Sequence, residues 1–488
     1  MNRATNASRM LIGGKLVESL SGDWLESIDP STEEVIGHAP AGNEADVDQA
    51  VEAAEAAWPA WHGIGVAARA EAMRAMGRRM LERADEILEV EVRDTGNTIT
   101  PMRGDVRSGV EGLNYYAGLA YELKGETIPS TPGGLHMTLR EPYGIVARIA
   151  PFNHPIMFAT ARTAAALIAG NAVIVKPPET SPLSALILAE IAAETMPPGV
   201  FNIVTGTGAG AGAPIARHPA IKRIAFIGSV PTGMAIQRAA AEVAVKHVTL
   251  ELGGKNPMIV FPDADIEETV SAAIAGMNFA WQGQSCGSTS RLLLHESIYD
   301  RVVEALVERV RSIRVGNPLD PESQMGPINS RGQYEKVLNY VEIAKGDGAR
   351  LAVGGARPAG DYFKRGFWIE PTLFVDVEQS MRIAQEEVFG PILSVLKWRT
   401  VDEAVAISNA TEFGLTASIR TNDINQAMDV ARRVRSGYIW INGAGPHFPA
   451  MPFGGFKNSG VAREEGIEEM LSYTETKAIH ILPQIRRQ

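Results

Sequence analysis

The chain has 488 residues, a length that predicts two or three domains rather than one. Its 57 aspartates and glutamates outnumber its 46 lysines and arginines, and no basic block occurs, which argues against nucleic acid as a partner. The single cysteine rules out an internal disulfide, and no apolar run is long enough to cross a bilayer, so we expect no membrane partner. Residues 1–10 lack the apolar stretch of a secretory signal, and together these features predict a cytoplasmic protein.

Helices come first along the chain, because residues 44–95 show Ala- and Glu-rich amphipathic spacing. Residues 118–144 alternate in polarity around a Pro-Gly-Gly turn, which predicts a protruding hairpin. Buried strands and helices then alternate as far as Gly254. Strands are expected at 144–151, 171–177, 199–206, 221–229 and 246–254, and helices at 155–170, 181–196, 211–219 and 231–243.

Apolar strands that are each followed by a helix predict a parallel sheet covered on both faces. This region is therefore expected to be a doubly wound, Rossmann-like α/β domain. A second alternation begins after Gly254 and predicts a second α/β domain. Its expected strands are 256–265, 290–297 and 367–377, and its expected helices are 298–313 and 331–346.

The only cysteine, Cys286, stands in the stretch GQSCGS. The local sequence predicts a loop between a helix that ends near Phe279 and a strand that begins at Arg291. Gly283 and Gly287 would let a substrate approach the backbone closely, and a thiol there can act as a nucleophile once its proton is removed. The alternative is that Cys286 is a small apolar core residue.

Two polar residues at the ends of predicted strands could serve the same chemistry. Glu251, in VTLELGG, lies at the sheet edge where ligands bind in such folds, and burial could raise its pKa into the range of a general base. Asn153, in APFNHP, could donate a hydrogen bond to a developing oxyanion. The alternatives are a carboxylate facing water for Glu251 and a turn-forming role for Asn153.

Two stretches point to a bound nucleotide. In VIVKPPE, Lys176 ends a strand, and Glu179 could accept hydrogen bonds from ribose hydroxyls. FIGSVPTG places Gly228, Ser229 and Gly233 at a strand-to-helix turn, where the helix N-terminus could hold pyrophosphate.

Three further glycine-containing stretches are less specific. GTGAGAG, at 206–212, matches a dinucleotide fingerprint, but runs of Gly and Ala match that pattern by chance. EEVFGP and PFGGFKNSG, in the second domain, are typical of turns.

In chain order, however, PFNHP, VKPPE, FIGSVPTG, ELGGKNP, GQSC, EEVFGP and PFGGFKNSG resemble the motifs of the NAD(P)-dependent aldehyde dehydrogenase superfamily. The resemblance extends from about residue 10 to 485, and the motifs have that family's order and spacing. It implies that Cys286 is the nucleophile and that Glu251 activates the hydrolytic water. Asn153 would donate to the oxyanion together with the backbone N–H of Cys286.

The resemblance also implies that NAD is the cofactor and that no metal is needed. NADP is the alternative, although the carboxylate of Glu179 favours NAD because it repels a 2′-phosphate. Ser229 would bind a phosphate and Glu387 the nicotinamide ribose. The complete set of residues expected to bind the cofactor is Ile149, Phe152, Lys176, Glu179, Gly228, Ser229, Gly233, Leu252, Glu387 and Phe389.

By the same resemblance, residues 1–119 and 143–252 would form the NAD-binding domain, and 253–460 the catalytic domain. Residues 120–142 and 461–488 would form an arm that joins subunits, with its C-terminal strand adding to a neighbouring subunit. This architecture implies a homodimer or a homotetramer.

The residues that would line the substrate tunnel depart from the common pattern of the family. His154 stands where an aromatic ring is usual and Ala161 where tryptophan is frequent, so we expect a wide, somewhat polar tunnel and a bulky or aromatic aldehyde as substrate. The alternatives are a betaine or amino aldehyde, for which two walls of an aromatic cation box are missing, and a CoA-acylating semialdehyde dehydrogenase, which generally lacks the base that Glu251 supplies. The histidines could also be ordinary loop residues. The expected tunnel residues are His154, Met157, Ala161, Ser285, His447 and Phe453.

Overall fold

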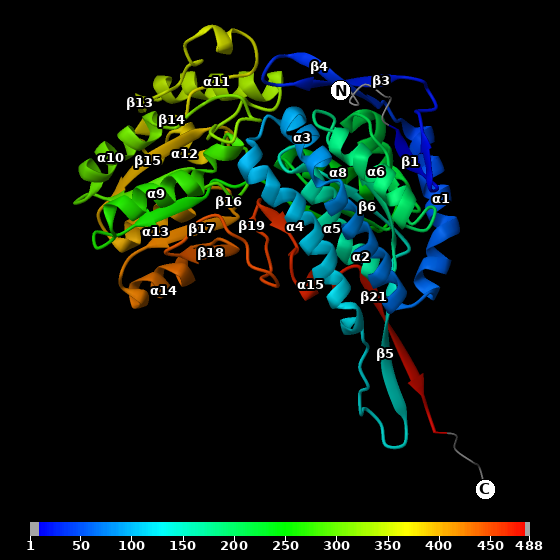
Figure 1. Ribbon diagram of the computed structural model, residues 1–488. Helices are drawn as coiled ribbons and strands as arrows, with labels where there is room; N and C mark the ends of the chain where they lie inside the picture. Colours follow the sequence, from blue (N-terminus) through cyan, green and yellow to red (C-terminus); the bar gives the residue numbers. More distant parts are fainter. Residues whose placement is uncertain (1–8, 484–488) are drawn as a thin grey trace.

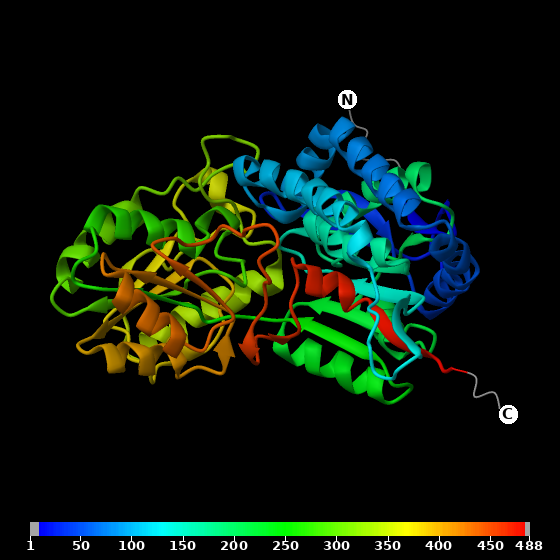
Figure 2. The same cartoon turned by 90° about the horizontal axis from the view of Figure 1, so that it is seen from below.

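The structure is a computed structural model that describes residues 9–483 (Figure 1). Two lobes lie side by side, each built around its own sheet, and a two-stranded arm projects from one of them (Figures 1 and 2). Both large sheets are mostly parallel and carry helices, which confirms the expected α/β fold. No helix between residues 9 and 483 combines the length and apolar character needed to span a bilayer. We predicted that residues 1–10 contain no secretory signal. Of these positions, residues 1–8 lie outside the described residues.

The first sheet has eight strands in the order β2-β1-β8-β7-β6-β9-β10-β20. The five neighbouring strands β8, β7, β6, β9 and β10 run parallel, so their carboxyl ends share one edge of the sheet. The bounds are β1 Met10–Ile12, β2 Lys15–Val17, β6 Ile145–Ile149, β7 Ala172–Lys176, β8 Phe201–Ile203, β9 Arg223–Ile227, β10 His247–Glu251 and β20 Gly460–Val461.

Alternate residues of these strands pack into two cores, one on each face of the first sheet. Val146 and Val173 pack with helices α2, α4, α5 and α6, whereas Ala147 and Ile174 pack with α1, α7 and α8. Since strand side chains alternate between faces, a sheet that is apolar on both faces must be covered on both. The helices are α1 Glu44–Gly63, α2 Val66–Glu82, α3 Ala84–Thr95, α4 Ile99–Gly118, α5 Pro155–Ala169, α6 Leu183–Thr195, α7 Ala213–Arg217 and α8 Val230–Ala241.

The second sheet has seven strands in the order β13-β14-β15-β12-β11-β17-β18, all parallel except β13. Strands β11, β12 and β14 and helices α10 and α11 were predicted from the sequence, and α9 is the helix expected to end near Phe279; the other elements of this lobe were not predicted. The strands are β11 Pro257–Val260, β12 Arg291–His295, β13 Arg350–Val353, β14 Thr372–Val375, β15 Ile392–Trp398, β17 Thr416–Arg420 and β18 Tyr438–Ile441. The helices are α9 Ile266–Met277, α10 Tyr299–Arg311, α11 Arg331–Gly346, α12 Arg382–Gln385, α13 Val401–Asn409 and α14 Ile424–Arg433.

Helix α4, which the sequence analysis missed, packs closely on α5. Its glycines lower helix propensity and hide its periodicity. They are needed because the two helices nearly touch: a Cβ at Gly112 would lie 2.6 Å from the Cβ of Ala161. Tertiary packing therefore decides the conformation of this segment.

The arm consists of β5 (Leu135–Pro142) paired antiparallel with β21 (Thr474–Ile481), and it projects below the first lobe in Figure 1. The hairpin expected at 118–144 forms in part, because Thr127 bridges Met137 antiparallel and the Gly134 N–H donates to the Thr131 carbonyl oxygen at the turn. The longer pairing of β5 is with the C-terminal strand β21 along its other edge, which the hairpin prediction did not include. Two further small pairs are β3 (Trp24–Asp29) with β4 (Glu34–Pro40), and β16 (Phe413–Gly414) with β19 (Phe456–Lys457).

The chain crosses between the lobes twice, once before and once after the strands of the second sheet in the sequence. It leaves the first sheet after Glu251 and returns at β20, where Gly460 pairs with Glu251. Helix α15 (Ile467–Leu471) then packs on α5, and Tyr473 is buried in the core of the first lobe. Of residues 461–488, which were expected in the arm, the arm strand holds Thr474–Ile481; residues 484–488 lie outside the described residues.

Candidate active site

The three residues predicted to be catalytic meet at a cavity of about 400 Å³, here called the substrate cavity. Cys286, Glu251 and Asn153 all line it. Helices α4 and α5 of the first lobe form part of its wall, and the loops around Cys286 and after β18, the ends of β9 and β10 and the segment after β20 also line it. The sequence separates these residues widely, but the fold brings them to one space between the two lobes.

Cys286 lies in the loop between Trp281 and β12, as the sequence predicted. Asn256 fixes this loop: its Nδ2 donates to the carbonyl oxygens of Cys286, at 2.7 Å, and Ser288, at 2.9 Å. The Oδ1 of Asn256 accepts from the Thr416 N–H at 2.9 Å, which ties the loop to β17. The sequence analysis missed this role of Asn256, whose signal was its place in ELGGKNP between the two domains.

The thiol of Cys286 is only partly exposed, and its environment disfavours a negative charge. Burial, together with the carboxylates of Glu387 and Glu251, raises the pKa of this thiol to about 12. The sulfur is therefore a protonated thiol in this state. A nucleophilic role requires that its proton be taken away at the moment of attack.

Glu251 ends β10 with its side chain buried, 5% exposed. Burial and the nearby Glu464 carboxylate raise its pKa well above the ordinary value. Neither of its carboxylate oxygens has a hydrogen-bond partner among residues 9–483. The wall beside it must be glycine, because a Cβ at Gly454 would lie 2.8 Å from Oε1. These features describe a carboxyl group that holds its proton more tightly than an exposed glutamate and is free to exchange it with a bound molecule.

Asn153 is held by its backbone, and its side chain stays available. Its carbonyl oxygen accepts from the Asn97 Nδ2 at 2.9 Å, while its own Oδ1 has no hydrogen-bond partner in the described part of the chain. The residue is 4% exposed and borders the substrate cavity. Its amide can therefore turn toward a group bound at Cys286.

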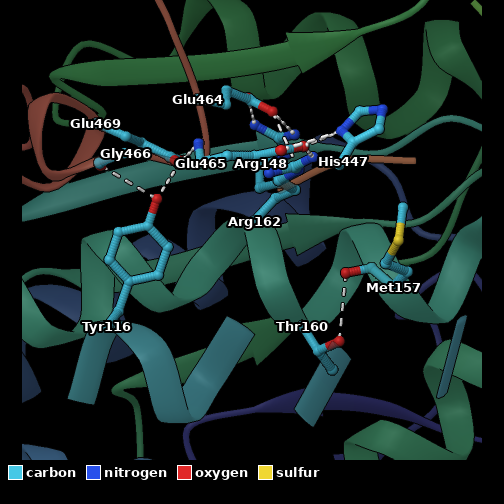
Figure 3. A network of polar contacts seen from close by, with 10 residues as sticks. All are labelled: Tyr116, Arg148, Met157, Thr160, Arg162, His447, Glu464, Glu465, Gly466 and Glu469. Atoms are coloured by element: carbon cyan, nitrogen blue, oxygen red, sulfur yellow. Dashed lines mark hydrogen bonds and ion pairs between the residues drawn. The ribbon is translucent and has the colours of Figure 1, made fainter. Parts of the chain in front are cut away.

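A buried network of charges, missed by the sequence analysis, borders the same cavity (Figure 3). Arg148 Nη1 lies 2.5 Å from Glu464 Oε1, and Arg162 Nε lies 3.2 Å from Glu464 Oε2. Arg162 also pairs with Glu465, which accepts from His447 Nδ1 at 2.8 Å. An arginine within the apolar strand IVARI was the signal, since buried arginines are nearly always paired.

The two arginines keep the network's carboxylates ionised. Burial alone would raise the pKa of Glu464, but Arg148 and Arg162 bring it below the ordinary value. Burial would likewise raise the pKa of Glu465, but Arg162 and His447 lower it to about 2. The neighbouring Glu469 behaves differently, because burial and Glu464 raise its pKa to about 7 and its carboxyl group pairs with the Tyr116 hydroxyl.

The residues predicted to bind the cofactor lie along the carboxyl ends of β6, β7, β9 and β10, here called the nucleotide edge. Lys176 ends β7, and burial lowers the pKa of its amine to about 8 although Glu179 opposes this. Glu179 is exposed, and its Oε2 accepts from the Gly208 N–H at 2.8 Å. Ser229 precedes α8 without capping that helix through its side chain, so the N–H groups of the first turn remain available to an anion. Ile149 ends β6.

The backbone is closely packed along this edge. A Cβ at Gly233 would lie 2.9 Å from Leu252, so the helix can approach the strand only with glycine there. Gly228 joins β9 to Ser229, and its N–H donates to the Glu251 carbonyl oxygen at 3.1 Å. All of these residues are where the sequence placed them, at the edge where doubly wound folds bind nucleotides.

Glu387 and Phe389 reach the nucleotide edge from the second lobe. Glu387 Oε1 accepts from the Gly254 N–H at 3.0 Å, and burial raises the pKa of this carboxyl group. Phe389 has a left-handed backbone, with φ of 57°, and its ring meets Phe152 edge-on at 5.6 Å between centroids. A dinucleotide fits this arrangement, because Lys176, the open start of α8 and Glu387 offer polar groups along one edge that leads to Cys286.

The six expected tunnel residues all border the substrate cavity. His154 is not an ordinary loop residue, because its Nδ1 lies 2.6 Å from Asp105 Oδ2 on α4. The expected wide, somewhat polar tunnel is also strongly aromatic. Further rings line it as well, from Tyr115, Tyr116, Phe158, Trp281, Trp440 and Phe448.

Comparison with known proteins shows the family. The model of the aldehyde dehydrogenase family matches residues 16–479. The aldehyde dehydrogenase tropH of Talaromyces stipitatus is 44% identical over 475 residues, which cover 96% of this chain and 92% of the relative. The chain therefore belongs to the aldehyde dehydrogenase family, and it is an NAD(P)-dependent oxidoreductase that acts on aldehydes.

Solved structures agree over the whole fold. PnpE from Pseudomonas sp. WBC-3 superposes with a TM-score of 0.95 at 37% identity, covering 99% of this chain and 100% of PnpE. The NAD⁺ complex of an aldehyde dehydrogenase from Bacillus cereus superposes with a TM-score of 0.94 at 37% identity, covering 98% of this chain and 96% of that chain. NAD(P) as cofactor is thus confirmed at the level of the family.

Proposed function

We propose that the protein oxidises a bulky, aromatic aldehyde to its carboxylic acid, with NAD as the hydride acceptor, through a covalent adduct on Cys286. The observation that carries the proposal is the meeting of Cys286, Glu251 and Asn153 at one cavity between the lobes. The thiol, the carboxyl group and the amide are the nucleophile, base and oxyanion donor that acyl chemistry requires.

In the proposed reaction the Cys286 sulfur loses its proton to solvent in the cavity and bonds to the carbonyl carbon of the aldehyde. The carbonyl π electrons move to oxygen, and the Asn153 amide and the Cys286 N–H donate to that oxyanion. When bound, NAD accepts the hydride that leaves this carbon, so the adduct becomes a thioester. Loop anchoring by Asn256 keeps the sulfur in place while the carbon changes its bonding.

Glu251 completes the cycle in this proposal. It removes a proton from water, the hydroxide adds to the thioester carbonyl, and the carbon–sulfur bond breaks to give the acid and the free thiol. The raised pKa of Glu251 supports this role, because a base that holds its proton more tightly removes one from water more readily. The overall change consumes one aldehyde, one water and one NAD⁺, and gives one acid, one NADH and one proton.

We propose NAD rather than NADP because Glu179 stands beside Lys176 at the ribose end of the nucleotide edge. Its carboxylate is fixed by the Gly208 N–H rather than free to swing away. Lys176 and Glu179 would hold the adenosine ribose, Ser229 a phosphate and Glu387 the nicotinamide ribose.

The rings around the substrate cavity support an aromatic aldehyde, because flat apolar walls stack well on a flat substrate. A betaine or amino aldehyde is the first alternative, since some of these rings could also face a cation. CoA-acylating chemistry is the second, and Glu251 argues against it because CoA needs no water-activating base. The arm supports a homodimer or homotetramer, and the single cysteine supports a cytoplasmic location.

The test follows NADH formation over a panel of aromatic, aliphatic and amino aldehydes, each with and without CoA. We expect the highest kcat/KM with aromatic aldehydes, no requirement for CoA, and the free acid as product. Strict dependence on CoA would overturn the hydrolytic step. A strong preference for quaternary-ammonium aldehydes would overturn the substrate class.

A further inference from the structure

One pair of residues in the substrate cavity has no part in the chemistry at Cys286. His154 Nδ1 lies 2.6 Å from Asp105 Oδ2, which joins the start of α5 to the middle of α4. Both side chains are nearly enclosed, with 13% of His154 and 8% of Asp105 exposed. A carboxylate that accepts the Nδ1 proton fixes the imidazole in one tautomer and one orientation.

The second nitrogen of this ring is left for another partner. Among residues 9–483, no hydrogen bond joins Nε2 of His154 to any group of the protein. Since His154 borders the substrate cavity, a bound molecule can reach the ring there. In the tautomer that carries its proton on Nδ1 toward Asp105, Nε2 is a hydrogen-bond acceptor.

The rest of the cavity indicates which donor would fit. Trp281 lies 5.4 Å and Phe158 lies 5.7 Å from the His154 ring, centroid to centroid, so the acceptor stands within an aromatic wall. A flat ring that carries a polar hydrogen matches such a wall.

A negatively charged substituent fits less well than a neutral donor. The carboxyl groups of Asp105, Glu111 and Glu465 border the cavity. Arg162 is the one arginine among the described residues that line the cavity. It is already paired with Glu465 and Glu464. A carboxylate on the substrate would therefore meet repulsion that a hydroxyl group would not.

We propose that His154, held in place by Asp105, accepts a hydrogen bond from a hydroxyl group of the substrate, and that the substrate class is a hydroxylated aromatic aldehyde. This inference rests on the proposed function and narrows its substrate. His154 is then a specificity-determining residue, and Asp105 is a positioning residue that acts through it. A buried site built for a hydroxyl group discriminates strongly against an analogue without one, because the acceptor is left unpaired.

The experiment compares 3- and 4-hydroxybenzaldehyde with the matching methoxybenzaldehydes, because the methoxy group keeps the ring's electronic character but has no hydrogen to donate. We expect kcat/KM to favour at least one hydroxy isomer over its methoxy partner by about 10-fold or more. In His154→Phe this ratio should fall to near one, because kcat/KM for the hydroxy compound should fall much more than kcat/KM for the methoxy compound. His154→Gln, which keeps a polar side chain, should restore part of the ratio.

Asp105→Asn tests the positioning role. We expect the hydroxy-to-methoxy ratio to fall several-fold through KM, with a smaller change in kcat, because the ring stays but loses its fixed tautomer. His218→Phe is the matched control: this histidine lies 3.5 Å from Asp48, outside the residues that line the cavity, and its loss should leave the ratio unchanged.

Three outcomes would overturn the inference. A wild-type hydroxy-to-methoxy ratio near one would remove the specificity role of His154. So would a His154→Phe variant whose kcat/KM falls equally for all aldehydes. A preference for 4-carboxybenzaldehyde that His154→Phe abolishes would show that the site binds an anion instead. By contrast, if the wild type formed no NADH from any aldehyde, the proposed function itself would fail, and this inference with it.

Discussion

On the nucleotide edge the polar side chains act one at a time, whereas around the substrate cavity they are linked into pairs and networks. Among residues 9–483, Glu179 makes one hydrogen bond, with the Gly208 N–H, and the amine of Lys176 is buried at a strand end. In the cavity, Arg162 pairs with two carboxylates, one of which also binds His447 (Figure 3). We therefore expect substitutions on the nucleotide edge to have local, graded effects, and substitutions in the cavity network to affect the whole site.

The largest expected effect lies where the two regions meet. Cys286→Ser should lower kcat by about 1,000-fold or more, because a hydroxyl group is a far weaker nucleophile than a thiolate. NAD binding, measured by calorimetry, should stay within about 2-fold of wild type, since the nucleotide edge does not depend on the thiol. Unchanged turnover with the serine variant would contradict the proposed role of Cys286.

Breaking the cavity network should cost stability. Arg148→Met leaves the buried Glu464 with one cation instead of two, and we expect a loss of about 3–5 kcal/mol in the free energy of unfolding. Urea denaturation measures it. The control is Arg9→Met, whose exposed pair with Glu18, at 3.5 Å, should contribute less than about 1 kcal/mol. Equal effects of the two substitutions would contradict the importance of the buried network.

The same network should make the protein sensitive to acid. The pKa of Glu465 is lowered to about 2 in the folded state, so its ion pair stabilises the fold at neutral pH. This contribution is lost as the pH falls from about 5 toward 2, because only the unfolded chain takes up the proton at first. Glu465→Gln should be less stable than wild type at pH 7 and should lose less stability on acidification. A parallel pH dependence of both proteins would refute this.

The smallest expected effect is on the nucleotide edge. Glu179→Ala removes one carboxylate, and we expect the ratio of kcat/KM for NADP to that for NAD to rise about 10-fold. Aldehyde preference should not change, because this residue is remote from the cavity lining. An unchanged cofactor ratio would show that Glu179 does not select the cofactor.

The same contrast explains what the sequence could predict. The nucleotide edge follows from local patterns: strands that are mostly apolar, with Lys176 at the end of β7 and Ser229 shortly after β9. Local chemistry alone left two interpretations open for each of Cys286, Glu251 and Asn153, one catalytic and one structural. The order of the seven motifs, through its resemblance to a known family, favoured the catalytic interpretation. All three were placed at one cavity by the structure, while their individual roles stay predictions.

The cavity network could not be predicted in the same way. Arg148 and Glu464 are 316 positions apart, and only the return of the chain at β20 brings them together. Helix α4 was missed because its glycines serve close packing on α5 rather than helix propensity. Asp105 lies on that helix, so its pairing with His154 was hidden as well.

The most direct test of the central claim is pre-steady-state NADH formation by Glu251→Gln. If Glu251 activates water, the variant should release about one NADH per active site and then stall, with steady turnover reduced about 100-fold or more. The acyl group should remain on Cys286, where mass spectrometry of the intact protein can detect it. Steady turnover equal to that of wild type, with no trapped acyl group, would contradict the account.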